Sequence, residues 1–279
     1  IIMNVLQIFI SFIIFSLFSS LVSAGLVLNP QRIVVLDRER TSSLELLNTS
    51  DEIARYQIYF EHKKMLEDGS IVDISESDEE HIRAGDMIRY SPRRVDIKSK
   101  GSQTIRLAIR RPKNLPDGEY ISHLALKQIP NKQAPIVNDI NNDASLEKEL
   151  SLKVQPILKI AIPVIVRKGE LHASAALSDI SNVHVNDASA YIQFTLGRDG
   201  NRSLYGDVEI YELDAGANPG ARVGFAKGIA LYDPTLFRLV RVQVNPSILV
   251  PGKKLLLRFD EKGRYGGNNL VEQVFTVLN

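Results

Sequence analysis

The stretch Leu150–Arg167 constrains the fold more than any other part of the sequence. Its even-numbered positions are all apolar, whereas its odd-numbered positions begin polar and become mixed. Successive side chains of a β-strand point to opposite faces of a sheet, so this alternation predicts a strand with one apolar face. At roughly 3.3 Å per residue an unbroken strand would run about 55 Å, which exceeds the usual strand length. The strand therefore either breaks at Pro156 or extends beyond its own sheet.

Two interpretations fit this stretch. It can be an ordinary core strand, or two strands that meet at Pro156. Alternatively, its apolar face is partly offered to another protein, which would add a strand to a sheet edge by β-augmentation. The flanking sequence has to decide between them.

Composition excludes several classes of protein. The chain has 279 residues, 44% of them hydrophobic, and a formal net charge of +1. The near-neutral charge gives no reason to expect nucleic acid as a partner. Cysteine is absent, which excludes disulfides, thiolate nucleophiles and cysteine metal sites. There is no nucleophile elbow or phosphate-binding glycine loop, and the five histidines are scattered, so we expect no enzyme activity, metal or cofactor.

The N-terminus is typical of an export signal. Val5–Leu21 is an apolar run broken by a few serines, and Val22-Ser23-Ala24 supplies the small residues that signal peptidase requires. We therefore expect residues 1–24 to be a signal peptide; an uncleaved membrane anchor is the alternative. A cysteine-free exported chain suits a bacterial periplasm better than a eukaryotic secreted module, so the periplasm is the expected location.

The rest of the chain consists of short alternating segments separated by turns rich in Gly, Pro, Asn and Asp. This pattern is typical of antiparallel β-sandwiches. Tyr90–Ile97 is expected as one short strand. A polar segment, Asn131–Glu149, is expected as a long loop before the organising strand. Lys168-Gly169-Glu170 reads as a connection between an N-terminal domain, 25–168, and a C-terminal β-sandwich, 169–279.

The chain resembles a divergent branch of a known family, the PapD-like periplasmic chaperones of chaperone–usher pilus assembly. The resemblance covers Leu28–Arg167 and rests on the order and spacing of several features. These are Arg32 before a strand, Tyr90-Ser91-Pro92, Gly101–Leu107, Leu115–Tyr120, Ala125–Pro130 and the ending Ile162–Arg167.

The resemblance implies two immunoglobulin-like β-sandwich domains joined at an angle. It also implies a chaperone that stabilises pilus or fimbrial subunits during protein folding, delivers them to an outer-membrane usher, and so serves fimbrium biogenesis and cell wall organisation. The chaperone would lend its strand to a subunit that lacks one. The donated residues would be Leu150, Leu152, Val154 and Leu158. The resemblance implies no cofactor, small-molecule substrate or nucleic acid. Self-association that caps the donor strand remains open.

The family also anchors the subunit's C-terminal carboxylate with two basic residues. One corresponds to Arg32, whose guanidinium can bind a carboxylate through two hydrogen bonds. The other is a lysine at a position that is Pro163 here. Lys159 is the nearest lysine on the same face, so the second anchor is Lys159, another residue, or absent. The usual Glu-Ser pair of the family is replaced by Glu119-Tyr120.

Two other functions remain open. In an immunoglobulin-like structural or adhesive surface protein, the long strand would simply complete its own sheet. The third alternative is a carbohydrate-active enzyme or lectin-like module on a sandwich fold.

Overall fold

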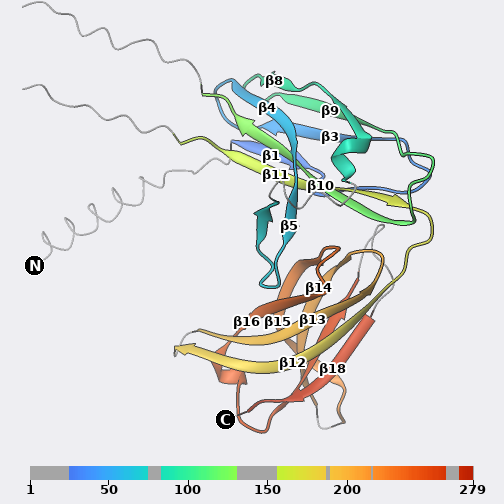
Figure 1. Ribbon diagram of the computed structural model, residues 1–279. Helices are drawn as coiled ribbons and strands as arrows, with labels where there is room; N and C mark the ends of the chain where they lie inside the picture. Colours follow the sequence, from blue (N-terminus) through green and yellow to red (C-terminus); the bar gives the residue numbers. More distant parts are fainter. Residues whose placement is uncertain are drawn as a thin grey trace, which may run out of the picture.

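The computed structural model describes residues 25–74, 83–130, 156–186, 189–214, 216–261 and 270–278. The expected signal peptide and the expected donor residues Leu150, Leu152 and Val154 lie outside these ranges. The described chain is almost entirely β-structure, arranged as two β-domains (Figure 1). The predicted all-β, two-domain fold is confirmed. No described helix has the length and apolar character needed to cross a membrane.

The first domain is a sandwich of a four-stranded and a five-stranded sheet. The first sheet has the order β1 (Leu26–Asn29), β3 (Thr41–Asn48), β9 (Ser102–Ile109), β7 (Ile88–Ser91). The second sheet has the order β2 (Ile33–Val35), β11 (Lys159–Lys168), β10 (Gly118–Gln128), β4 (Ala54–Glu61), β8 (Arg94–Ile97). A short 3₁₀ helix, η1 (Ala84–Met87), precedes β7.

Alternation in the sequence explains how the two sheets bury a common core. In β3 and β9 every second side chain is buried, including Leu44, Leu46 and Ile105, which are fully covered. The organising strand does the same in its last part, where Val164 and Val166 pack into this core. Among the described residues of this stretch, the strand begins at Lys159.

One expected strand is wrong. Tyr90–Ile97 forms two strands, β7 and β8, which belong to different sheets. The chain crosses the sandwich between them, around Pro92. Proline has no backbone N–H to donate to a ladder, which explains why neither strand continues through it.

The second domain is a seven-stranded sheet that folds over on itself. Its order is β12 (Ala173–Asn186), β13 (Ser189–Gly200), β16 (Phe237–Val244), β15 (Pro219–Leu231), β14 (Leu204–Leu213), β17 (Lys254–Asp260), β18 (Leu270–Thr276). A 3₁₀ helix, η2 (Pro246–Ile248), follows β16. Strands β15 and β16 pair only at Gly224 and Val244, so this pair joins two layers. Asn182 hydrogen-bonds both backbone groups of Leu278 and brings the two edges together.

The two domains are connected by more than the linker. Between β4 and η1 the chain forms a hairpin, β5 (Lys63–Met65) and β6 (Ile71–Asp73), which reaches from the first domain to the second (Figure 1). Met65 is buried in the apolar core of the second domain. The hydroxyl of Thr235 donates to the Met65 carbonyl at 2.7 Å, and the Leu239 N–H donates to the Glu67 carbonyl at 2.6 Å.

The tip of this hairpin depends on a glycine. Gly69 has φ +83°, and a Cβ at this position would overlap the guanidinium of Arg238. Arg238 is itself held by a hydrogen bond from Nη1 to the Ala230 carbonyl at 2.5 Å. The absence of a side chain at residue 69 therefore lets the hairpin lie flush against the second domain.

We predict that Gly69→Ala destabilises the protein by about 1–3 kcal/mol more than Gly252→Ala, the usual range for overpacking. Gly252 is a matched control, because its φ is +82° and a Cβ added there would meet open space. Both variants carry the backbone strain, but only the first adds the overlap with Arg238. Urea unfolding of the two variants measures the difference. Equal losses would show that the guanidinium of Arg238 moves aside at little cost.

Candidate functional site

Arg32 lies just before β2, the short strand that covers part of β11 at the edge of the five-stranded sheet. Strand β2 is parallel to β11 and pairs with it from Ile33, opposite Val164, to Val35, opposite Val166. Arg32 directly precedes this pairing and so lies level with Pro163. This is the level at which the sequence resemblance puts the two carboxylate anchors.

The guanidinium of Arg32 is buried and has no acceptor among the residues that the structure describes. All three of its nitrogens are covered, and none donates a hydrogen bond within the described part of the chain. Its Cζ lies 4.1 Å from the ring centre of Tyr205 and 5.6 Å from that of Tyr232, both from the second domain. Burial lowers the pKa of Arg32, and the nearby Tyr232 and Glu119 oppose this effect. An arginine keeps its charge under such a shift, so the site is a buried, unpaired cation.

A buried ion pair of the first domain lies beside this cation, and its carboxylate also contacts the second domain. Nε of Arg167 donates to Glu119 Oε2 at 3.0 Å, and the Glu119 side chain is fully buried. The other carboxylate oxygen of Glu119 accepts from the backbone N–H of Ser203, in the second domain, at 3.1 Å. Glu119 is therefore engaged by these donors, which explains why it makes no hydrogen bond with Arg32.

The first half of β11 has an open edge. Strand β10 pairs with β11 along its whole length, from Lys159 to Lys168. On the other side β2 covers only Val164–Val166, and no described strand pairs with Lys159–Ile162. This edge offers unpaired backbone groups to an incoming strand. Just before it, Ile157 and Leu158 are 51% and 41% exposed.

The structure does not bring Lys159 together with Arg32. Lys159 lies four residues before Pro163 on the strand, a displacement of about 13 Å. Its Nζ is bound to Glu61 Oε1 at 2.7 Å, while Lys63 lies 3.1 Å from the other oxygen of Glu61. The hydrogen bond to Glu61 raises the pKa of Lys159. A role for Lys159 as the second anchor stays a prediction.

Sequence reasoning missed Tyr205 and Tyr232. Both belong to the second domain. Tyr205 is in β14, and Tyr232 comes directly after β15. No motif marks them, because only the packing of one domain on the other brings them to Arg32. For the donor strand, the structure describes only Leu158 of the four expected residues.

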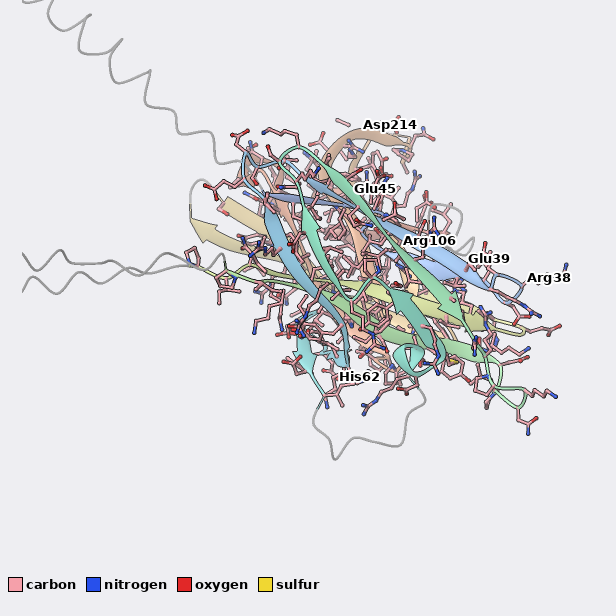
Figure 2. All side chains as sticks on the ribbon, turned by 90° about the horizontal axis from the view of Figure 1, so that it is seen from above. Arg38, Glu39, Glu45, His62, Arg106 and Asp214 are labelled. Atoms are coloured by element: carbon pink, nitrogen blue, oxygen red, sulfur yellow. The ribbon has the colours of Figure 1, made fainter. Side chains whose placement is uncertain are left out.

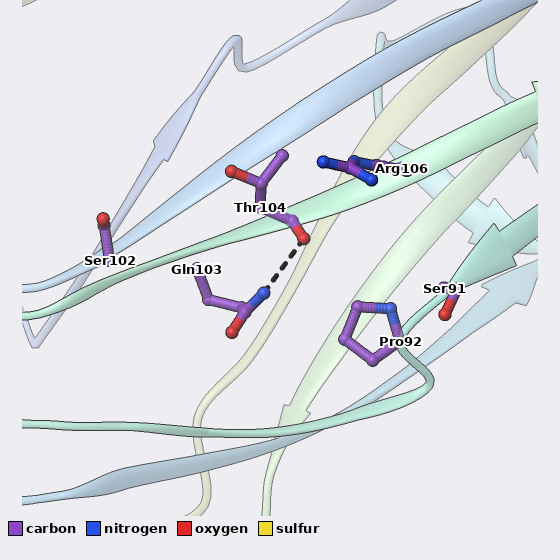
Figure 3. Close-up of a pocket in the computed structure, with 6 residues that line it drawn as sticks. All are labelled: Ser91, Pro92, Ser102, Gln103, Thr104 and Arg106. Atoms are coloured by element: carbon purple, nitrogen blue, oxygen red, sulfur yellow. Dashed lines mark hydrogen bonds between the residues drawn. The ribbon is translucent and has the colours of Figure 1, made fainter.

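A surface hollow lies apart from the Arg32 site. A hollow of about 590 Å³ lies on the four-stranded sheet, lined by Ser91, Pro92, Ser102, Gln103, Thr104 and Arg106 (Figure 3). The side-chain amide of Gln103 donates to the Thr104 carbonyl at 3.1 Å, and Arg106 is the only charged side chain in this lining. Within the described ranges no three histidine, aspartate or glutamate side chains gather as a metal site would require. His62 lies between β4 and β5, far from Arg106 on β9 (Figure 2).

No protein-family model matches the sequence, and no curated protein matches it. Among solved structures, the chain is similar to the YadV chaperone, with a TM-score of 0.48 and 14% identity over 90% of this chain and 100% of that chain. It is similar to the chaperone CupB2 of Pseudomonas aeruginosa, with a TM-score of 0.44 and 12% identity over 91% and 100%. The chain is structurally similar to fimbrial chaperones.

A third similar structure is the CsuC–CsuE chaperone–tip adhesion subunit complex of Acinetobacter baumannii, with a TM-score of 0.44 and 14% identity over 89% of this chain and 98% of that chain. The resemblance predicted from the sequence is thus confirmed as a structural similarity. Identities this low concern the fold, so the function has to be argued from the residues of this chain.

His123 can be used to test how far water is excluded from the surroundings of Glu61. It lies in β10 between Glu61 and Pro163 in the sheet, is 5% exposed, and its Nδ1 has no partner among the described residues. His123 is thus a deeply buried histidine. Burial lowers its pKa from 6.5 to about 4, with Lys63 adding to this effect and Glu61 opposing it.

We predict that the free energy of unfolding falls by up to about 3 kcal/mol as the pH drops from 6.5 to 4, because the unfolded state binds a proton that folded His123 refuses. Above pH 6.5 the histidine is neutral in both states and this dependence disappears. Urea unfolding between pH 4 and 8 should show a shallower dependence for His123→Gln, and no change for the exposed His172→Gln. An unchanged dependence in His123→Gln would show that another group is responsible.

Proposed function

We propose that this chain is a periplasmic chaperone that binds and stabilises pilus or fimbrial subunits by donating a β-strand, and delivers them to an outer-membrane usher. The observation that carries the proposal is the buried, unpaired guanidinium of Arg32 at the end of the open edge of β11. The similar solved structures are named as chaperones too, but the proposal rests on this geometry.

The direction of the strands links these two features. Strand β11 runs from its open half toward Val164, where β2 takes over the edge in a parallel orientation. A guest strand parallel to β11 would therefore end beside Arg32, and its last group would be a carboxylate. An antiparallel guest would bring a terminal amine to the same cation, which like charge disfavours. The edge and the arginine together favour a polypeptide that binds parallel to β11 and ends there.

The same geometry argues against an immunoglobulin-like surface protein. A buried guanidinium without an acceptor lowers stability, and an apolar residue of similar size would be better tolerated in a purely structural protein. An open sheet edge is likewise a liability unless something binds it. Both costs are explained when a strand of the subunit pairs with the open edge of β11 and the terminal carboxylate of the subunit binds Arg32.

In the proposed complex, the upstream part of the strand would supply side chains. Leu150, Leu152, Val154 and Leu158 would share one face of an extended strand, and the family resemblance implies that they are the donated residues. Alternate apolar side chains of one lent strand can fill the groove of a subunit that lacks a strand, while its backbone completes the subunit's sheet.

The first test concerns the carboxylate. We expect Arg32→Ala to weaken the complex with the pilin-like product of a neighbouring gene by at least about 30-fold, since removing one partner of a buried charge pair costs about 2–5 kcal/mol. Arg106→Ala is the control, because Arg106 is an exposed arginine on the other sheet (Figure 2). The complex is measured by co-purification and by subunit dissociation. Equal affinity of the two variants would remove the anchor role of Arg32.

The second test concerns strand donation. Periplasmic co-expression with the same subunit should yield a one-to-one complex, and Leu152→Asp should abolish it, because a carboxylate cannot enter an apolar groove unpaired. Ser151→Asp, on the opposite face of the same stretch, is the matched control and should bind normally. A wild-type chain that purifies alone, with a subunit that survives without it, would favour the structural or adhesive surface protein.

A further inference from the structure

In the structure Arg32 is closed to any ligand. Its three guanidinium nitrogens are completely covered. A carboxylate cannot bond to donors that have no accessible surface, so part of the cover has to move before Arg32 can bind one. The identity of the cover therefore determines which anions reach the site.

Two aromatic rings of the second domain form part of the cover. The ring of Tyr205 stacks on the guanidinium with a Cζ-to-centre distance of 4.1 Å, and that of Tyr232 lies at 5.6 Å. Tyr205 is positioned by Gly228, which has φ +68° and has no side chain where the Tyr205 hydroxyl lies. Tyr232 begins a turn in which its carbonyl accepts the N–H of Thr235 at 2.9 Å. The hydroxyl of Thr235 binds the β5–β6 hairpin, so this turn is tied to the first domain.

The rings protect the cation without satisfying it. Their faces attract the guanidinium by cation–π interaction, but they accept none of its N–H groups in the plane where a carboxylate would bind. A free anion has to lose its water and also move a ring, with only its own binding energy to offset both costs. A carboxylate at the end of a strand already paired with β11 is held beside the site, at a high effective concentration.

We propose that Tyr205 and Tyr232 are specificity-determining residues of the Arg32 site, which keep it closed to free carboxylates and admit the terminal carboxylate of a strand docked on β11. The inference rests on the proposed function for the identity of its ligand. It assigns the second domain a direct part in recognition.

The closed site can be tested without any subunit. The probe is acetate, titrated at constant ionic strength into the full ¹⁵N-labelled chain, and the readout is the Nε–H resonance of Arg32, assigned by its loss in Arg32→Lys. In the wild type we expect no shift. In Tyr205→Ala and Tyr232→Ala we expect a saturable shift, and exchange of this proton with water at least about tenfold faster. Tyr191→Ala, in β13, is the control and should behave as wild type.

Two further results decide the proposal. Tyr232→Phe keeps the ring and should leave Arg32 closed, which separates covering from hydrogen bonding by the hydroxyl. A wild-type Arg32 that binds acetate as strongly as the alanine variants would overturn the proposal, even if those variants fold poorly.

The second arm uses the subunit complex. Acetate should compete with the subunit in Tyr232→Ala but not in the wild type; competition of equal strength in both would overturn the specificity role. Suppose that acetate behaves as expected but Arg32→Ala leaves the subunit bound normally. The role of the two rings as a cover of Arg32 is then supported, and the proposed carboxylate anchor is wrong.

Discussion

The unpaired charge of Arg32 is the constraint on which the rest of the structure depends. Its stacking on Tyr205 contributes about 0.5–2 kcal/mol, whereas each buried donor left without an acceptor costs about 1–3 kcal/mol. The arrangement is therefore a net cost in the free protein. It persists because the surroundings fix it: β2 holds the backbone of Arg32, and the Glu119–Arg167 pair holds the domain interface beside it.

That cost explains why two domains are needed. One sheet alone would leave Arg32 in water, where a carboxylate gains little from binding it. The second domain removes the water by placing Tyr205 and Tyr232 over the guanidinium, and the hairpin carrying Met65 and Gly69 fixes that domain in place. In a site without water, an ion pair with good geometry is stronger than at the surface. The free-energy cost of desolvating the arginine has already been met during folding.

The sequence predicts the parts of this design that local alternation encodes. The strands β3, β4, β9 and β11 follow from period-two patterns, and the family resemblance drew attention to Arg32. The error at Tyr90–Ile97 arose because a crossing between sheets looks like a continuous strand when read locally. Lys159 has the expected face, but its partner Glu61 comes from two strands away. Tyr205 and Tyr232 could not be predicted, because they reach Arg32 through the packing of domains.

Under the proposed function, neither element of recognition reads the identity of a side chain. The open edge of β11 from Lys159 to Ile162 binds backbone, and Arg32 binds a carboxylate that every chain carries at its end. What the two share is a direction and a distance, because a guest strand must run parallel to β11 and stop beside Pro163. Such a site distinguishes a strand that ends from one that continues. A chaperone that serves subunits of different sequence needs this distinction, and the apolar face upstream can then adapt to each groove.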